Sequence, residues 1–307
     1  LGYGYQRLAS GSTLPEGPPL KICLVQPNIP QDLKWDPGYL TATLEKLRTL
    51  TRTCLPERPA LVIWPEAATP FFYQAEENYR EILGDTVREA GTLLLFGRPS
   101  YEEVPGGQEF FNSAFLLSPR NSIVGKYDKI HLVPYGEYVP LQRFFPFIQK
   151  MVEGISDFSP GRDIQNMSLP ACSFATLICY EIIFPDLVRR FVDRGAQFIV
   201  NITNDAWFGA TSAPQQHLSM AVFRAVENKR FIARCANTGI SAFIAPSGRI
   251  TRQTNIFTEA VLHDMIYCIQ QRTVYTRYGD IFALLCVAAG VLCVAMTRLR
   301  KGKHLVP

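Results

Sequence analysis

Residues 175–202 read ATLICYEIIFPDLVRRFVDRGAQFIVNI, and this stretch decides the class of fold. Two short apolar runs, at 175–179 and 198–202, have the length and composition of buried β-strands. Between them, apolar residues recur at helical spacing, namely Leu187, Val188, Phe191 and Val192. A strand, a helix and a second strand in this order predict a layered α/β domain with a well-buried sheet.

The same alternation runs through the rest of the chain. Apolar runs at 22–25, 61–64 and 92–96 also predict strands. Three further apolar sets have helical spacing: Leu40, Leu44 and Leu47; Tyr79, Ile82, Leu83 and Val87; Leu218, Ala221, Val222, Ala225 and Val226. No internal repeat or low-complexity linker interrupts this pattern before about residue 270. The α/β pattern therefore occupies most of the chain.

The composition excludes several functional classes. The 307 residues are 47% hydrophobic and 19% charged, with a net charge of +4. The basic residues are mostly scattered singly, so we expect no nucleic-acid partner. The one tight basic cluster lies at the C-terminus and consists of Arg298, Arg300, Lys301 and Lys303.

The eight cysteines and four histidines show no metal-ligand spacing. Because neither a CxxC pair nor an HExxH motif is present, we expect no metal site and no cofactor. The cysteine spacing does not indicate a disulfide framework either, although whether some cysteines pair stays open. Cys286 and Cys293 lie in an apolar run, where a cysteine behaves as a small hydrophobic residue.

The segment from Ile281 to Met296 reads IFALLCVAAGVLCVAM and contains no charge. As a helix it spans about 24 Å, and residues 278–279 and 297–299 extend it to the ~30 Å of a bilayer core. A buried terminal core helix is the alternative. We favour a membrane span because a core helix has no reason to end in four cations. By the positive-inside tendency the basic tail is cytoplasmic, which puts the α/β domain on the outer face of the membrane.

Cys179 ends a predicted strand and precedes a predicted helix, in the run Ile178-Cys179-Tyr180-Glu181. A cysteine there can be a thiolate near backbone N–H groups. The alternative is a buried, inert cysteine. Three other polar segments are candidates for the same site.

Glu66 directly follows the strand at 61–64, where ligands bind in α/β sheets, although a solvated loop charge is the alternative. Lys129 lies in Lys126–Leu132, KYDKIHL, whose alternative is a charged edge strand. Glu137 follows in the segment 134–140, PYGEYVP, where it could be a turn residue. Each signal is weak alone.

Together these motifs resemble the nitrilase superfamily. The shared features are Glu after a strand, Lys in KxHL and Cys in CYExxFP, in this order and spacing, with NITNDAW at 201–207 and RAVEN at 224–228. Four further motifs resemble one branch, apolipoprotein N-acyltransferase: WDP at 35–37, WPEAATP at 64–70, HLVPYGEYVP at 131–140 and NDAWFG at 204–209. The likeness extends over nearly the whole chain.

The resemblance implies an α-β-β-α sandwich and a thioester mechanism. Cys179 would attack a phospholipid ester, and the N-terminal amine of an S-diacylglyceryl cysteine of a lipoprotein would then take the acyl chain. Glu66 would be the general base, and Lys129 with the backbone N–H of Tyr180 would hold the oxyanion. Glu137, ahead of Glu181, would orient Lys129 and Cys179 or tune their pKa values.

Apolar side chains near these motifs are candidates for lipid contact. The segment 138–148 is aromatic and broken by proline, and residues 71–73 are aromatic as well. Either these residues form a rim that contacts acyl chains, or they fold onto the core. The lipid-contact candidates are Trp35, Phe144, Phe145, Phe147 and Trp207.

The expected organisation follows from the resemblance and the terminal helix. Residues 1–19 would connect to a multi-helix membrane region that the family has and that this chain, which begins with Leu, lacks. Residues 20–270 would form the catalytic domain, 278–299 a transmembrane helix and 300–307 a cytoplasmic tail. We expect a monomer in a bacterial inner membrane, with the catalytic domain on the periplasmic face.

Two other functions remain open. One is a membrane-anchored amidase or nitrilase that acts on a small C–N substrate with the same three residues. The other is an inactive nitrilase-like module that binds a lipid or a protein. The presence of all three catalytic residue types argues against the inactive module, and the apolar segments argue against a soluble substrate.

Overall fold

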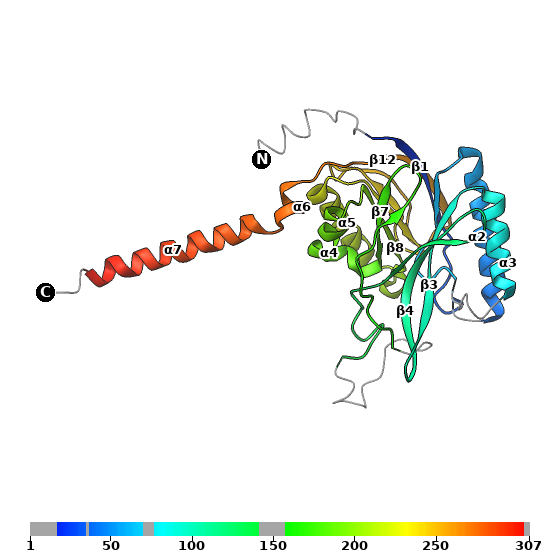
Figure 1. Cartoon of the computed structure of the whole chain (residues 1–307), viewed down its shortest axis with the longest axis horizontal. Helices are drawn as coiled ribbons and strands as arrows, with labels where there is room; N and C mark the ends of the chain where they lie inside the picture. Colours follow the sequence, from blue (N-terminus) through cyan, green and yellow to red (C-terminus); the bar gives the residue numbers. More distant parts are fainter. Residues whose placement is uncertain (1–16, 35–36, 70–76, 141–156, 304–307) are drawn as a thin grey trace.

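Two six-stranded sheets pack face to face in the computed structural model, which describes residues 17–34, 37–69, 77–140 and 157–303 (Figure 1). The first sheet has the order β12 (Ala260–Tyr267), β1 (Pro19–Gln26), β2 (Leu61–Ile63), β3 (Leu93–Val104), β4 (Gly107–Leu117), β5 (Ile123–Asp128). The second has the order β11 (Ile250–Gln253), β10 (Ala242–Ile244), β9 (Ile232–Ala236), β8 (Phe198–Thr203), β7 (Ser173–Ile178), β6 (Met167–Ser168).

Helices cover the outer face of each sheet, which gives four layers in all (Figure 1). The first sheet is covered by α2 (Leu40–Cys54) and α3 (Glu77–Ala90), the second by α4 (Pro185–Asp193) and α5 (Ala213–Asn228). The α-β-β-α sandwich expected from the sequence is therefore confirmed.

Strand β1 shows why the chain forms this sandwich. Ile22 and Leu24 belong to the core between the sheets, whereas Cys23 and Val25 belong to the core beneath α2 and α3. Because side chains alternate along a strand, a strand buried on both faces needs an unbroken apolar run. The five apolar runs of the sequence are confirmed as β1, β2, β3, β7 and β8, and the four helical patterns as α2–α5.

The parallel strands of both sheets determine where polar loops gather. In the first sheet β1, β2 and β3 are parallel, and in the second β7, β8 and β9 are parallel. Their carboxyl ends open at one edge of the sandwich, which is where α/β proteins place their sites. Glu66 follows β2 and Cys179 follows β7 at this edge.

Two disulfides correct the expectation that no disulfide framework exists. Cys23 of β1 is bonded to Cys54 at the end of α2, and Cys172, just before β7, to Cys268, just after β12. The partners are 31 and 96 residues apart, so only the folded chain brings them together. Among the described residues, the free cysteines are Cys179, Cys235, Cys286 and Cys293.

The C-terminal helix projects away from the sandwich as a single rod (Figure 1). Short helix α6 (Val274–Tyr278) ends at Gly279, and α7 runs over Ile281–Lys303. The helix therefore begins at Ile281 rather than Tyr278. The window Ile281–Arg298 has a mean hydropathy of 2.2 and is 0% buried, so the alternative of a buried core helix is wrong. Its length and composition allow it to cross a membrane.

Candidate active site

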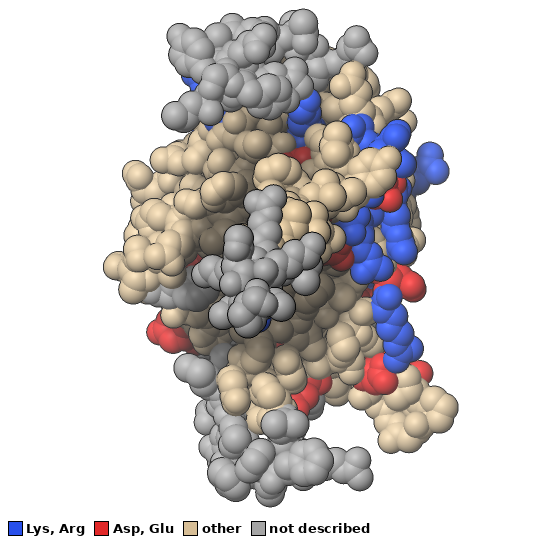
Figure 2. Space-filling view, turned by 90° about the vertical axis from the view of Figure 1, so that its left-hand side faces the viewer, with Lys and Arg blue, Asp and Glu red and all other residues tan. Residues whose placement is uncertain are grey.

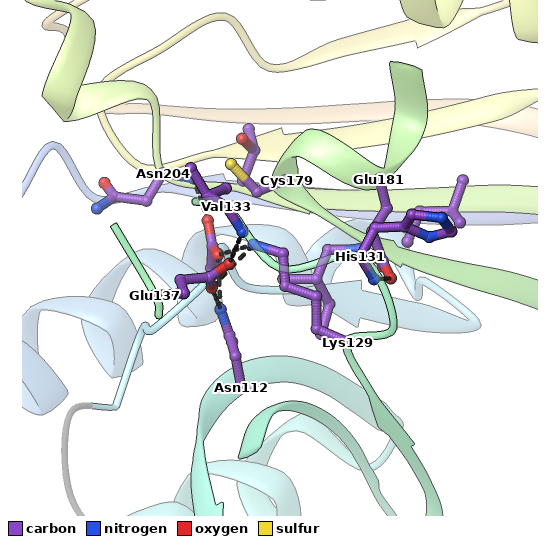
Figure 3. A network of polar contacts seen from close by, with 12 residues as sticks. Asn112, Lys129, His131, Val133, Glu137, Cys179, Glu181 and Asn204 are labelled. Atoms are coloured by element: carbon purple, nitrogen blue, oxygen red, sulfur yellow. Dashed lines mark hydrogen bonds and ion pairs between the residues drawn. The ribbon is translucent and has the colours of Figure 1, made fainter. Parts of the chain in front are cut away.

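Three polar side chains meet where β2, β5 and β7 end. Glu66 lies three residues beyond β2, Lys129 directly follows β5, and Cys179 directly follows β7. Lys129 Nζ lies 3.3 Å from Glu66 Oε1, and Cys179 lies beside this network (Figure 3). The segment that carries Lys129 is thus the end of an edge strand, yet its side chain is 1% exposed and points inward. The edge-strand and active-site interpretations of this segment are both compatible with the structure.

Each described hydrogen-bond partner of the Glu66 carboxylate is a donor. Oε1 accepts hydrogen bonds from Asn112 Nδ2 at 2.9 Å and from Lys129 Nζ, while Oε2 accepts one from the backbone N of Asn204 at 2.9 Å. An ionised carboxylate satisfies all three. The side chain is also buried, so these hydrogen bonds form away from bulk solvent.

Glu137 forms the other side of the Lys129 pocket. Its Oε1 accepts hydrogen bonds from Lys129 Nζ at 2.9 Å and from Asn112 Nδ2 at 2.7 Å, and its Oε2 accepts one from Val133 N at 2.8 Å. Asn112 and Lys129 thus each donate to both carboxylates, Glu66 and Glu137 (Figure 3). This closed set fixes the ammonium between two anions.

Charge and burial act in opposite directions on Lys129. Burial alone would lower its pKa, but Glu137 and Glu66 together raise the pKa well above the usual range. Lys129 is therefore a cation at neutral pH. A fixed buried cation is suited to hold a developing oxyanion.

Cys179 does not have the low pKa that its position suggested. Burial raises the pKa of its thiol to about 12, and Glu66 acts in the same direction, while Lys129 opposes them. This raised pKa favours a thiol over a thiolate in the resting site. A short 3-10 helix η3 (Cys179–Ile183) stands between β7 and α4, so Cys179 does not lie at the start of the α-helix. The thiol needs a general base to react.

Glu181 supports the site through backbone groups. It is fully buried; its Oε1 accepts hydrogen bonds from Tyr127 Oη and from the N–H groups of Ile130 and His131, and its Oε2 accepts one from Ile178 N. Burial raises the pKa of Glu181 to about 7. Among the described contacts, Glu181 makes no hydrogen bond to the side chains of the proposed catalytic triad, Glu66, Lys129 and Cys179. It ties the loop that carries Lys129 to the strand that carries Cys179.

The loops of the site hold unusual backbone conformations. Cys179 has φ +53°, and Ala67 and Tyr135 have φ +46° and +62°. A residue other than glycine in this region costs about 1–2 kcal/mol. Gly97 lets β3 approach the Glu66 loop, because a Cβ there would lie 2.7 Å from Glu66 Cα. The catalytic loops are thus held in position by their surroundings.

Sequence reasoning missed two side chains that touch Glu66. Asn112 lies in β4 within the run Phe110–Leu117, where two adjacent polar residues, Asn112 and Ser113, among apolar ones were the available signal. Lys34 is 3% exposed, and its Nζ donates to the backbone O of Glu66 at 3.0 Å. It directly precedes the WDP motif, but nothing in its spacing indicated that it is buried.

Lys34 is a second cation beside the catalytic groups. Burial lowers its pKa from 10.5 to about 8, although the charges of Glu66 and Cys179 oppose this. The unfolded chain therefore binds this proton more tightly than the folded one. Burying the protonated Lys34 lowers the free energy of unfolding. This destabilisation is fully present at neutral pH and disappears as pH rises from 8 to 10.5. It amounts to about 3 kcal/mol.

Substituting Lys34→Met should stabilise the fold and impair the site. We expect the free energy of unfolding to rise at pH 7, with the gain over the wild type shrinking as pH approaches 10.5. Acylation of Cys179 should fall about tenfold, because a charged hydrogen bond to the Glu66 loop is worth about 1.5–3 kcal/mol. Urea denaturation at both pH values and an acylation assay measure the two effects. Unchanged acylation would remove Lys34 from the site.

The remaining predicted site residues divide into described and undescribed ones. Tyr180 is half-buried and packs edge-on against Phe184, with ring centroids 5.2 Å apart. Trp207 is 52% exposed in η4 (Asp205–Phe208). The other lipid-contact candidates, Trp35, Phe144, Phe145 and Phe147, lie outside the described residues, as do residues 71–73. Within the described ranges, no group of three or more His, Cys, Asp or Glu could hold a metal ion.

Comparison with known proteins identifies relatives of this chain. A family model of carbon-nitrogen hydrolases matches residues 21–271. The chain is 44% identical over 306 residues to an apolipoprotein N-acyltransferase of Geobacter metallireducens, covering 99% of this chain and 58% of that protein. It is 37% identical over 311 residues to another from Chlorobaculum tepidum, covering 92% and 58%. The chain thus spans less than two thirds of the length of these relatives.

Solved structures with the same fold are more distant. Nit3 of Saccharomyces cerevisiae, a member of branch 10 of the nitrilase superfamily, has a TM-score of 0.63 at 19% identity, covering 83% of this chain and 92% of that one. An amidase from Nesterenkonia sp. AN1, in complex with acrylamide, has a TM-score of 0.60 at 19% identity, covering 87% and 96%. The expected nitrilase-like fold is confirmed.

Proposed function

Because the chain belongs to the carbon-nitrogen hydrolase family, we propose that it uses the nitrilase-type site for acyl transfer. The acyl chain passes from a phospholipid to Cys179 and then to the N-terminal amine of an S-diacylglyceryl cysteine on a lipoprotein. One observation carries this proposal: the 44% identity to an apolipoprotein N-acyltransferase covers 99% of the chain, and thus every residue of the site.

In the first half-reaction Cys179 attacks the ester carbonyl of the phospholipid. Glu66 takes the thiol proton, since the thiol, with a pKa of about 12, does not ionise alone at neutral pH. The C–O bond of the tetrahedral intermediate then breaks. The proton moves from Glu66 to the departing oxygen, which leaves a lysophospholipid and a thioester on Cys179.

In the second half-reaction the neutral amine of the lipoprotein attacks the thioester. Glu66 accepts a proton from the amine and passes it to the departing Cys179 sulfur as the C–S bond breaks, which forms an amide, the Cys179 thiol and the free base. A thioester is a reactive acyl donor toward an amine, so one slow transfer becomes two faster steps. No metal or cofactor enters either step.

Both tetrahedral intermediates carry a negative oxygen. Lys129 is the side-chain donor for this oxyanion, and the backbone N–H of Tyr180 is the second donor. Glu137 and Asn112 keep the ammonium in place by the contacts at 2.7–2.9 Å. Because Glu137 supplies negative charge on the side opposite Glu66, Lys129 is not drawn wholly toward the base.

Two features support a position on the outer face of a bacterial inner membrane. The exposed apolar helix α7 ends in basic residues, which favours a cytoplasmic C-terminus. The disulfides Cys23–Cys54 and Cys172–Cys268 are of the kind formed in the oxidising periplasm and rare in the cytosol. Residues 20–270 then form the periplasmic catalytic domain, 281–299 the membrane anchor and 300–307 the cytoplasmic tail.

The face of the sandwich next to α7 also supports contact with lipid. Figure 2 looks at the side of the molecule from which α7 projects and shows a broad uncharged area, with Lys and Arg gathered along its right-hand edge. Every exposed residue of α5 before its C-cap is uncharged: Gln215, Gln216, Ser219, Met220, Phe223 and Val226. The helices α2 and α3, in contrast, carry ion pairs such as Arg48–Glu89. Water-facing helices normally carry charge on the exposed face.

Deleting residues 281–307 should separate anchoring from chemistry. We expect transfer from phospholipid in a bilayer to fall at least tenfold, because the helix raises the effective concentration of the domain at the membrane. Acylation by a short, water-soluble ester should be nearly unchanged, since all triad residues precede residue 182. Both substrates are measured on one folded preparation, checked by circular dichroism.

The uncharged α5 face predicts that this defect is partial. Adding Phe223→Glu to the deletion should deepen it, whereas Glu45→Gln on α2 should not. Equal loss on both substrates would mean that α7 belongs to the fold, and loss on neither would contradict the membrane anchor.

The direct test of the function uses the intact chain in detergent micelles. Phospholipid with a labelled acyl chain and a synthetic diacylglyceryl-cysteine peptide should yield labelled N-acyl peptide. The alternative, an amidase for a small C–N substrate, has the same triad and a similar fold, so it predicts release of ammonia from small amides and no labelled peptide. The inactive binding module predicts neither product.

A further inference from the structure

The carbonyl oxygen of Cys179 is held by two side chains from other elements. His217 Nε2, from α5, lies 3.1 Å from this oxygen, and Asn201 Nδ2, from β8, donates to it at 3.3 Å. We propose that His217 is a positioning residue: through the Cys179 carbonyl it aims the Tyr180 N–H that binds the oxyanion. This proposal rests on the acyl-transfer site proposed above and deepens it.

The argument begins with the geometry of one peptide bond. The carbonyl of Cys179 and the N–H of Tyr180 belong to the same planar, trans unit, so they point in opposite directions. Fixing the carbonyl therefore fixes the direction of the N–H. A hydrogen bond to the carbonyl also polarises the peptide and strengthens its N–H as a donor.

This peptide needs such an anchor because its backbone is strained. Cys179 has φ +53°, a region that costs a residue with a side chain about 1–2 kcal/mol. Without the two contacts to its carbonyl, the Cys179–Tyr180 peptide could rotate toward a relaxed conformation. The thiol could remain accessible while the N–H turned away from the reacting carbonyl.

His217 is itself held by a buried charged pair. Its Nδ1 lies 3.0 Å from Asp205 Oδ1 and 3.1 Å from Arg234 Nη2. Arg234 Nη2 donates to Asp205 Oδ2 at 2.8 Å, and Arg234 Nη1 donates to Asn201 Oδ1. Arg234 thus contacts both side chains that bind the Cys179 carbonyl. Thr203 Oγ1 donates to Asp205 Oδ1 at 2.9 Å and completes the set.

The direction of the His217 hydrogen bond follows from its partner. A carbonyl oxygen only accepts, so Nε2 must carry a proton. Burial lowers the pKa of His217, and Arg234 adds to this effect, while Asp205 opposes it. Nδ1 faces both an acceptor, Asp205 Oδ1, and a donor, Arg234 Nη2, and the Nε2 hydrogen bond to the Cys179 carbonyl is the same with either partner.

The surroundings leave little room for another arrangement. Gly239 lies against Asp205, and a Cβ there would come within 2.8 Å of Asp205 Cβ. The side chains of Asp205 and Arg234 are fully buried, and that of His217 is 7% exposed. The buried side chains of Asp205, Arg234 and His217 take no part in the proton transfers of Glu66. Their burial around the Cys179 carbonyl therefore supports a positioning role.

The test compares two amides at position 217. The amide nitrogen of Gln can occupy the place of histidine Nε2, whereas the shorter Asn cannot reach it. His217→Gln should keep acylation of Cys179 within about threefold of wild type. His217→Asn and His217→Ala should lose about 10–100-fold, less than the 10²–10³ for complete removal of an oxyanion donor. His263→Asn, on β12 outside the site, is the control.

The readout separates positioning from simple damage. Acylation by a p-nitrophenyl ester passes through an oxyanion, whereas alkylation by iodoacetamide reports only the reactivity and access of the thiol. His217→Asn should slow acylation and leave alkylation within about twofold of wild type. Both are followed as the mass of the Cys179 peptide of the 307-residue chain in detergent.

The outcomes are distinct. Equal acylation rates for His217→Asn and His217→Gln would overturn the proposal, as would a parallel loss of acylation and alkylation. Because the ester needs no membrane or lipoprotein, the proposal can hold even if the phospholipid donor is wrong. If the wild-type Cys179 accepts no acyl group from any ester, the proposed function itself fails and this inference falls with it.

Discussion

Replacing Cys179 with alanine should abolish acyl transfer. The thiol sulfur is the atom that carries the acyl chain between the two half-reactions, and Cys179 lies beside the contacts of Lys129 (Figure 3). Cys179→Ser should be nearly as inactive, because a serine hydroxyl is harder to deprotonate than a thiol whose pKa is already about 12. Transfer of labelled acyl chains to a diacylglyceryl peptide measures the loss.

The matched control is Cys286→Ala, a free cysteine exposed on α7. It should leave transfer unchanged, since alanine keeps the apolar character of the helix. If Cys179→Ala retained a tenth of wild-type transfer while folding normally, the thioester mechanism would be wrong.

Glu66→Gln should reduce transfer by roughly 10³-fold or more, in the upper range for a general base. Two effects combine in this variant. The substitution removes the proton acceptor for Cys179, and it places an amide among three donors, from Asn112, Lys129 and Asn204. Both the formation of the thioester and its transfer to the amine should slow.

The pH dependence of this variant gives a second check. Without a base, the reaction depends on the thiolate fraction, which grows tenfold per pH unit below the pKa of the thiol. Burial and the charge of Glu66 both raise the pKa of the Cys179 thiol. Removing this charge should therefore lower the pKa somewhat, yet burial should keep the pKa above neutrality. Residual acylation of Glu66→Gln should therefore rise steeply from pH 7 to 9. A flat profile, or full activity at pH 7, would show that another group is the base. Glu45→Gln on α2 is the control.

The sequence predicts the fold best at strands that are buried on both faces. The runs at 22–25 and 198–202 are apolar at every position or nearly so, and strands enclosed by helices need this. Strands β4–β6 and β9–β12 were not predicted. In β11 and β12 burial is partial and polar residues interrupt the pattern, and in β9, which is buried throughout, Arg234 interrupts the apolar run. Edge strands carry a weaker signal than central ones.

Residues of the candidate site could be predicted from the sequence only where they stand in a motif just after the end of a strand. Glu66, Lys129 and Cys179 meet this condition, and the structure brings the first two within 3.3 Å. Lys34 and His217 could not be found in this way. Their roles depend on contacts with backbone oxygens of Glu66 and Cys179, which leave no mark in the spacing of residues.

The disulfides and the state of the nucleophile show the same limit. Cys172 and Cys268 pair across 96 residues, a separation that no local pattern encodes. The pKa of Cys179 is raised by burial and by Glu66, which lies 113 positions earlier in the sequence. Electrostatic properties of a buried site arise from residues that are distant in sequence and close in space.

The mass of the Cys179 peptide after incubation with phospholipid tests the central claim most directly. The intact chain in micelles, given phospholipid and no lipoprotein, should gain the mass of one acyl chain at Cys179. The adduct should disappear when a diacylglyceryl-cysteine peptide is added, with the same chain recovered on the peptide amine. An unmodified Cys179 in protein that still transfers acyl chains to the peptide would contradict the account.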